Sequence, residues 1–363
     1  YLDIYRTSKW FYVPFMIEGF RRMDEKDISY ITQLVERADA DDVILLYSFT
    51  MQKVRNSLLM NLYWETSLFL GYPFAKSGFR PYGYDPELGR QQLRHLVQLV
   101  KEGSWDNVRS ILLHHQKSVM DRLIVNMEPL IRRIPDQEQI SFVWRIYNGH
   151  PQVCYDLSYR LLHEMYMGEY RNKEFLPSYE KMAEKYGYSI STIRRTIKLL
   201  NQLGTCRSEN GKGTRIFTIG EKGDSPDFSC KAIRRNLAYF FQAFELIIYS
   251  CENVFMMTLP TLTAQQYNDL INQLKIYADT DQCELSLWCL LITIAEACPL
   301  HSIREIYGKL YGLFLWGHPL KTNHEKGEHN ISDQDFTLAL IHTLENKNIN
   351  ETALLIKDFV SRQ

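Results

Sequence analysis

A mainly α-helical fold is predicted, in which a winged helix-turn-helix lies between two similar all-helical domains. Three observations predict it. Apolar residues recur at helical spacing along most of the chain, strand-like alternation is confined to a few short stretches, and segments on either side of a basic centre repeat one another.

Composition limits the possible classes of protein. The 363 residues exceed one typical domain, and a hydrophobic content of 45% is enough for at least two cores. Because 42 Lys+Arg oppose 43 Asp+Glu, any surface that binds a polyanion must be local. Seven cysteines without a CxxC pair indicate a reducing cytoplasm, and the densest apolar run, Leu287 to Ala295, has about half of the ~20 residues a membrane helix needs.

Helical spacing is clearest near the N-terminus. Asp27 to Arg37 places Ile28, Ile31, Leu34 and Val35 on one face, and its other face is charged. Two further stripes, in Gln91 to Val100 and after Asp106, predict a short-looped helical hairpin. Strand-like alternation is found at Thr214 to Ile219 and, less clearly, at Phe142 to Tyr147.

Two pairs of segments repeat in the same order. Leu62 to Phe74 resembles Leu310 to Leu320, and both contain glycine, an aromatic ring and proline, beginning at Gly71 and Gly317. Leu96 to Leu112 matches Leu340 to Ile356, each a helix, a polar turn and a second helix. The alternative is that any two helical segments look alike. We expect a first helical domain over 1–130, a linker over 131–150, a winged helix-turn-helix over 151–220 and a second helical domain over 228–363.

The centre of the chain has the start and stop signals of a helix-turn-helix. A helix over Tyr155 to Met167 precedes one over Tyr179 to Tyr186, which Ser178 begins and Gly187 ends. Ser189 or Ser191 begins a third helix over Thr192 to Leu203, and Gly204 ends it. Two short strands, Cys206 to Glu209 and Thr214 to Ile219, flank Asn210-Gly211-Lys212-Gly213 and predict a hairpin wing.

Positive charge is concentrated in this central segment. Between Arg171 and Arg215 ten Lys or Arg and four Glu give a local charge of +6, which suits contact with phosphates. On the third helix Arg194, Arg195 and Lys198 share the polar face, opposite an apolar face that must be buried. The alternative interpretation is a solvated basic helix, which the turn and the wing make less attractive.

The same segment resembles the winged helix-turn-helix of GntR-family repressors. The similarity spans roughly fifty residues and lies in Leu176-Pro177-Ser178, Met182-Ala183, Tyr186-Gly187, Ser189, Ser191-Thr192-Ile193-Arg194, Leu199-Leu200, Leu203-Gly204 and Gly211-Lys212-Gly213-Thr214. It implies a bacterial transcription regulator whose recognition helix enters the major groove and whose wing reaches the minor groove. Glu180 and Ile190 stand where the family usually has arginine, which implies altered base recognition and retained backbone binding.

We therefore expect a double-stranded DNA operator as partner. The expected DNA-contacting residues combine the cationic helix face with the turn and the wing. They are Ser178, Tyr179, Ser189, Ser191, Thr192, Arg194, Arg195, Lys198, Lys212, Gly213, Thr214 and Arg215.

The flanking helical domains resemble the effector domains of the FadR branch of that family. The similar parts are Ala295-Glu296-Ala297, Ile303-Arg304 through Leu313 and the terminal helical hairpin. Many members of the branch bind a metal through one Asp and three His, whereas here Leu287-Trp288 and Phe336-Thr337 occupy the corresponding segments. We expect neither metal nor cofactor. The cluster of His324, Glu325 and His329 is expected to be a solvated loop, and His114-His115 to complement a helix dipole.

The resemblance also implies an unknown small-molecule effector. The candidate lining residues are aromatic: Tyr63, Trp64, Tyr307, Tyr311 and Trp316. The alternative is that these rings belong to the plain core. No nucleotide-binding, metalloprotease or nucleophile-elbow motif is present, so we do not expect an enzyme.

An alternative function is a protein-interaction module whose degenerate recognition turn no longer binds DNA. An apolar exposed face on the third helix would favour it, and a positive face would favour DNA.

The chain begins at Tyr1 with neither Met nor a signal peptide, which suggests a missing natural N-terminus. Because a winged helix-turn-helix precedes only the second helical copy, we expect another one upstream of Tyr1, in a tandem duplication. The protein would then act as a homodimer or as a pseudo-dimer within one chain.

Overall fold

The computed structural model describes residues 2–37, 40–70, 86–127, 134–147, 152–217, 221, 223–321 and 332–362. It is mainly helical and has one two-stranded antiparallel sheet, which confirms the predicted fold class. The chain forms two compact units. Unit 1 comprises Tyr1–Trp144, Ile248–Tyr307 and Asp333–Ser361, and unit 2 comprises Arg145–Ile247, Gly308–Ser332 and Arg362–Gln363. The predicted domain boundaries stay predictions.

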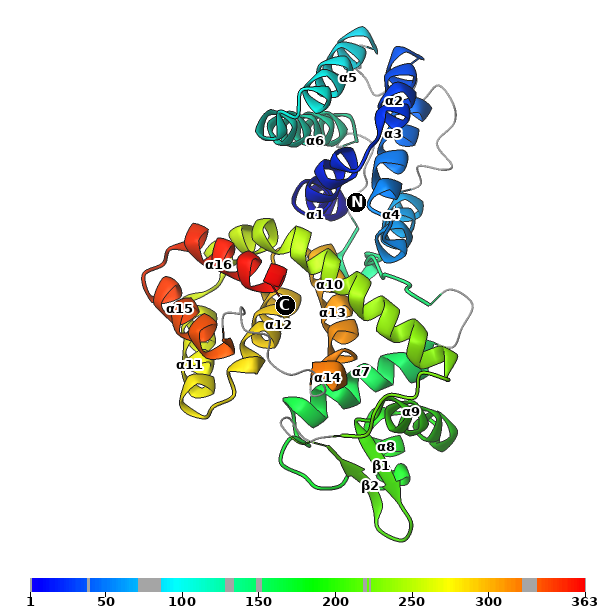
Figure 1. Cartoon of the computed structure of the whole chain (residues 1–363), viewed down its shortest axis with the longest axis vertical. Helices are drawn as coiled ribbons and strands as arrows, with labels where there is room; N and C mark the ends of the chain where they lie inside the picture. The colour runs from blue at the N-terminus through cyan, green and yellow to red at the C-terminus, as the bar shows by residue number, and fades with distance from the viewer. Residues whose placement is uncertain are drawn as a thin grey trace. The chain divides into compact units, whose positions relative to one another are not determined.

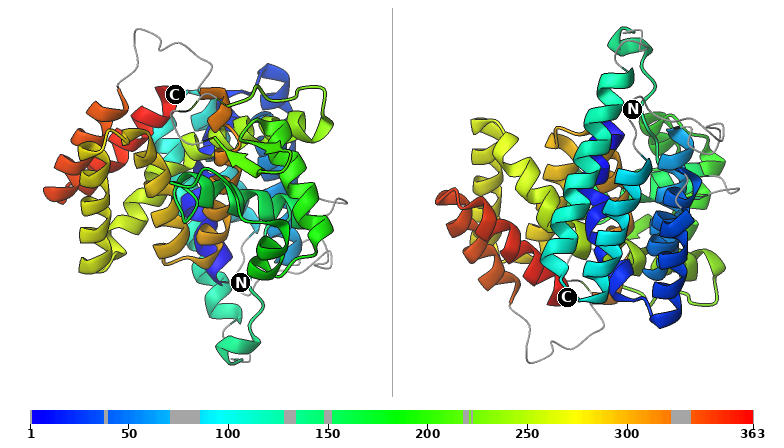
Figure 2. Two further views of the ribbon diagram at one scale, coloured as in Figure 1. Left: turned by 90° about the horizontal axis from the view of Figure 1, so that it is seen from below. Right: turned by 90° about the horizontal axis from the view of Figure 1, so that it is seen from above.

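The N-terminal part of unit 1 is a bundle of six helices (Figure 1). Helix α1 packs against α3 and α6, and α2 packs against α3 and α5. Figure 2 shows the long α6 running beside α1. The bounds are α1 Leu2–Arg21, α2 Glu25–Arg37, α3 Ala40–Lys53, α4 Ser57–Phe69, α5 Pro86–Lys101 and α6 Trp105–Met127.

A close backbone approach and a helix cap fix this bundle. A Cβ at Gly19 of α1 would lie 2.1 Å from the carbonyl oxygen of Thr50, so only glycine lets α1 and α3 come this near. Asn56 begins α4, since its side chain accepts the amide hydrogen bond of Leu59 at 2.9 Å. Phe11 and Phe15 of α1 are fully buried, and the Phe15 ring packs on that of Tyr249, whose residue belongs to the same unit.

The later helices follow the central segment. Helix α11 packs against α12 and α15. A capping box between Thr263 and Gln266 begins α11. The bounds are α10 Lys231–Thr258, α11 Ala264–Asp279, α12 Ser286–Ala297, α13 His301–Leu315, α14 His318–Lys321, α15 Asp333–Glu345 and α16 Ile349–Arg362.

Within unit 1 the early and late helices contact each other directly. The Asp3 carboxylate accepts hydrogen bonds from the amides of His301 and Ser302, at 2.7 and 2.6 Å, and so caps the start of α13. Arg109 of α6 donates to the side-chain oxygen of Asn253 of α10 at 2.8 Å. One core therefore joins segments from both ends of the sequence.

Unit 2 contains the central segment. Helix α9 packs against α7, α8 and β1 (Figure 1), and the elements are α7 Gln152–Tyr166, α8 Tyr179–Tyr186, α9 Ile190–Leu203, β1 Cys206–Glu209 and β2 Gly213–Ile216. A third extended segment joins the hairpin, because the Leu176 amide donates to Thr214 and the Ile216 amide donates to Glu174, at 2.8 and 2.9 Å. The predicted α8 and β1 are confirmed with their bounds, whereas α7 and α9 begin three and two residues earlier than expected. The strand β2 spans Gly213–Ile216 where Thr214 to Ile219 was expected.

One predicted strand is wrong. Residues 142–147 form no strand and pair with no other segment in the described part of the chain. Instead of pairing with a strand, the Trp144 amide donates to the Glu305 carboxylate at 3.0 Å, and its indole N–H donates to Asn61 at 2.7 Å. Gly71, in the first of the two similar segments that the sequence analysis paired, lies outside the described residues. No helix in the described part of the chain is long and apolar enough to cross a membrane.

Candidate nucleic-acid interface

The first helix of the helix-turn-helix is fixed at both ends. Ser178 begins α8, and its hydroxyl accepts the amide hydrogen bond of Lys181 at 3.4 Å. Gly187 ends α8 in the left-handed conformation, with φ 70°. Ser178 is exposed, whereas Tyr179 is half-buried. The turn therefore has the local chemistry that the sequence predicts.

Ser189 begins the second helix, α9, by accepting the amide hydrogen bond of Thr192 at 3.2 Å. Its hydroxyl also contacts the hydroxyl groups of Ser191 and Thr192, at 2.8 and 3.0 Å. The sequence left open whether Ser189 or Ser191 is the cap, and the structure assigns the role to Ser189. Ser191 is exposed in the first turn of the helix.

Helix α9 has two distinct faces. Its buried face consists of Ile193, Thr196, Ile197, Leu200 and Leu203. Its exposed face carries Arg194, Arg195 and Lys198, which form no salt bridge within the described part of the chain. Three free cations thus follow one side of the helix, at a spacing that suits successive phosphates or base edges.

The hairpin forms the wing. Cys206 pairs with Ile216 and Glu209 with Gly213, and the connecting turn uses positive φ at Gly211 and Gly213. Lys212 at the tip is 72% exposed and lies 3.5 Å from the Glu209 carboxylate. Thr214 is only 4% exposed, so its side chain does not reach solvent.

Two arginines of the wing are already paired. Arg207 forms a salt bridge with Asp224, and Arg215 forms one with Glu221 at 2.7 Å. Asp224 and Glu221 lie after Arg215, outside the segment over which the charge of +6 was counted. That count therefore overstates the free positive charge of the segment. The Phe217 ring lies 5.4 and 5.8 Å from the two guanidinium groups. The unpaired charge of this region is therefore concentrated on α9.

The two departures from the expected motif are both exposed. Glu180 lies in the first turn of α8, where its own backbone amide, the Ser178 hydroxyl and nearby Arg194 lower the pKa of its carboxyl. Glu180 is thus ionised near Arg194. Ile190, 38% exposed, is the first residue of α9.

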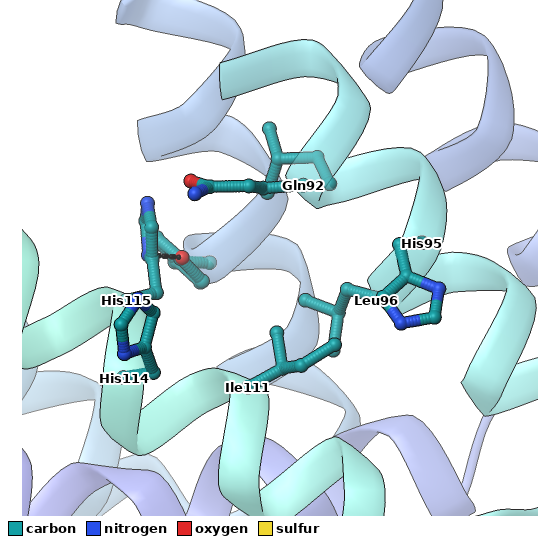
Figure 3. Close-up of a pocket in the computed structure, with 8 residues that line it drawn as sticks. Gln92, His95, Leu96, Ile111, His114 and His115 are labelled. Carbon is teal, nitrogen blue, oxygen red and sulfur yellow. Dashed lines mark hydrogen bonds between the residues drawn. The ribbon is translucent and has the colours of Figure 1, made fainter. Parts of the chain in front are cut away.

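A cavity of about 150 Å³ lies in unit 1 between α3, α5 and α6 (Figure 3). Its walls are mainly apolar, and the Tyr47 hydroxyl contacts His115 Nδ1 at 2.7 Å. Burial raises the pKa of Tyr47. In Figure 3 Leu96 and Ile111 lie between His95 and the pair His114 and His115. The lining residues are Tyr47, Gln92, Leu93, His95, Leu96, Ile111, His114 and His115.

The aromatic residues predicted to bind a ligand do not line this cavity. Tyr63 and Tyr307 are engaged by Ser48 and Ser250, at 3.4 and 2.8 Å, and Tyr311 contacts His163 at 2.8 Å. Trp64 is 41% exposed and Trp316 fully buried. The prediction that His114-His115 end a helix is wrong, because both lie in the middle of α6, Trp105–Met127. With His95 of α5 they line the cavity instead.

No cluster of three or more metal-ligating side chains occurs among the residues whose placement is described. The predicted loop with His324, Glu325 and His329 lies outside them.

Comparison with known proteins supports the central assignment. Residues 165–205 match the family model described as a helix-turn-helix domain. No curated protein matches the chain. A solved structure of Streptococcus agalactiae GntR is similar at 17% identity, over 57% of this chain and 97% of that chain, with a TM-score of 0.23. That likeness is too weak to indicate a shared fold, so the assignment depends on the domain match and on the geometry.

Proposed function

We propose that this protein is a sequence-specific, DNA-binding transcription regulator of the GntR type. The observation that carries the proposal is the exposed face of α9, where Arg194, Arg195 and Lys198 are free of ion pairs in the described chain. A helix-turn-helix with such a face places its second helix in the major groove. Because this face is cationic rather than apolar, it favours DNA over a protein partner.

The GntR assignment is supported by the wing and the turn. A short antiparallel hairpin follows α9 directly, and glycines at 211 and 213 allow its tight tip. Glu180 and Ile190 would change which bases are contacted, because α8 and the start of α9 carry them at the surface. Contacts with the phosphate backbone would be retained.

We also propose that the helices before and after this module are two copies of one FadR-like domain. The order α1, α2, α3, α4, α5, α6 parallels α10, α11, α12, α13, α15, α16. Two of the packed helix pairs also correspond, since α2 packs on α3 and α5, and α11 packs on α12 and α15. Such a chain would behave as a pseudo-dimer and would act, without catalysis, in the bacterial cytoplasm.

A small effector would bind between α3, α5 and α6. A cavity of about 150 Å³ is smaller than a typical drug-sized site, so it suits a ligand with few heavy atoms. Tyr47 and His115 would supply its polar contacts. Thermal-shift screening of small molecules tests this, since a true ligand should stabilise the native protein and lose that effect in His115→Ala.

Selection of bound genomic fragments, followed by titration of the selected operator, tests DNA binding. Arg194→Gln/Arg195→Gln/Lys198→Gln should abolish specific binding. A matched control removes three exposed cations elsewhere, at Lys101, Lys117 and Arg362, and should bind as the native protein does. Equal binding by both triple variants would contradict the proposal.

A further inference from the structure

The cavity between α3, α5 and α6 has walls that carry no fixed charge. Among its lining residues, all of which the structure describes, none is Lys, Arg, Asp or Glu, and the polar side chains are Tyr47, Gln92 and three histidines. Burying an ionised group costs free energy unless an opposite charge balances it. An anion or a cation in this cavity would lack a permanent partner of opposite charge in the wall. The walls therefore favour an uncharged ligand.

The apolar part of the wall comes from α5 and α6. Leu93 and Leu96 of α5 are 5% and 1% exposed, and Ile111 of α6 is half-buried. With a volume of about 150 Å³, the cavity is of the size that admits benzene when apolar side chains line it. A single six-membered ring, or a branched chain of similar volume, would therefore fill it.

The cavity offers a hydrogen bond where Tyr47 and His115 meet. The Tyr47 hydroxyl contacts His115 Nδ1 at 2.7 Å, and in Figure 3 the amide end of Gln92 extends toward the same side as His115. Burial raises the pKa of Tyr47, so its hydroxyl keeps its proton. If that hydroxyl donates to His115 its oxygen can accept another hydrogen bond, and if it accepts from His115 it can donate one. A ligand hydroxyl suits both cases, because it donates and accepts.

We propose that this cavity binds an uncharged alcohol or phenol of about six carbon atoms, whose hydroxyl group hydrogen-bonds to Tyr47. The proposal rests on the proposed function, in which the same cavity is the effector site, and adds the chemical class of the ligand. The carbon atoms would contact Leu93, Leu96 and Ile111. A carboxylate of the same size would enter without a balancing charge.

Titration of the DNA-free full chain with phenol, benzene and benzoate, followed by ligand-observed NMR, tests the class of ligand. Phenol should bind, benzene should bind about fivefold more weakly because it forms no hydrogen bond, and benzoate should not bind. Tyr47→Phe should lower the phenol affinity about fivefold, to that of benzene, and leave the benzene affinity unchanged. Tyr30→Phe removes an exposed hydroxyl from the same helical bundle and should match the native protein.

A variant with a filled cavity locates the binding. Ile111→Phe places a ring in the cavity and should abolish binding of both phenol and benzene, and thermal melts verify that each variant is folded. Unchanged phenol affinity in Tyr47→Phe or in Ile111→Phe would overturn the proposal. Benzoate affinity equal to that of phenol would overturn the uncharged class and leave the effector site in place. If no probe binds, the proposal and the effector cavity both fail, whereas operator titration decides separately whether the protein binds DNA.

Discussion

Arg194 is the side chain best placed to contact a base. It lies one turn into α9 on the exposed face, and Glu180 is the acid that influences it electrostatically. Arg194→Ala should weaken operator binding by about 1–3 kcal/mol and relax specificity at one base pair. Lys212→Ala, at the tip of the wing, should weaken all sequences about equally. Binding curves for a panel of single-base operator variants distinguish the two effects, and identical profiles for both variants would refute the groove assignment.

Two helix-ending glycines make a matched test of backbone strain. Gly187 and Gly204 both have positive φ, at 70° and 86°. A Cβ at Gly187 would meet nothing within 4 Å, whereas a Cβ at Gly204 would lie 1.9 Å from the Asp224 carbonyl oxygen. Gly187→Ala should therefore cost about 1 kcal/mol, from conformation alone, and Gly204→Ala clearly more. Calorimetric melting of both variants gives the comparison, and a smaller loss at Gly204 would contradict the close approach.

The residues that begin and end helices could be predicted from the sequence, whereas a residue whose burial depends on a distant segment could not. Ser178, Gly187 and Gly204 were identifiable because a cap depends on its own helix. Thr214 was expected at the DNA surface, but its strand is covered by the segment at 174–176, about forty residues earlier in the chain. A single-sequence pattern does not indicate such a pairing.

At the scale of elements, the wing is a charged hairpin whose charge is largely neutralised. Arg207 and Arg215 face each other across the strands, and Asp224 and Glu221 balance them. Asp224→Asn should free Arg207, so non-specific DNA affinity should rise and the salt slope should steepen by up to about 1. An exposed pair contributes little to stability, so the melting temperature should change only slightly. An unchanged non-specific affinity and salt slope would show that the wing faces away from the DNA.

The incorrect strand at 142–147 has an element-scale cause. Alternation of apolar and polar residues shows that one side of an extended segment is buried, but it does not supply a partner strand. Here Glu305 and Asn61 side chains satisfy the Trp144 amide and indole groups, so the segment stays outside any sheet. The periodicity of apolar residues predicted the helices well, because a helix forms its backbone hydrogen bonds within its own segment and needs no partner strand.

For the whole molecule, the number of free charges sets the salt dependence of DNA binding. The sequence alone, with its local +6, suggests about five phosphate contacts and a log–log slope of roughly −4 to −5. Pairing of Arg207 and Arg215 removes two of these, so we expect about three contacts and a slope of roughly −3. Titration across a range of salt concentrations measures it. A slope near zero would exclude DNA as the partner.

The Asp3 cap on α13 has a consequence for how the chain is made. Asp3 is 299 residues from Ser302, so α1 leaves the ribosome about 15 to 60 s before the backbone amides it caps exist. During that interval the buried faces of Phe11 and Phe15 lack the late helices of their own unit. Unit 1 therefore cannot be completed until α16 has been synthesised, and until then the nascent chain must keep an apolar helix from aggregating.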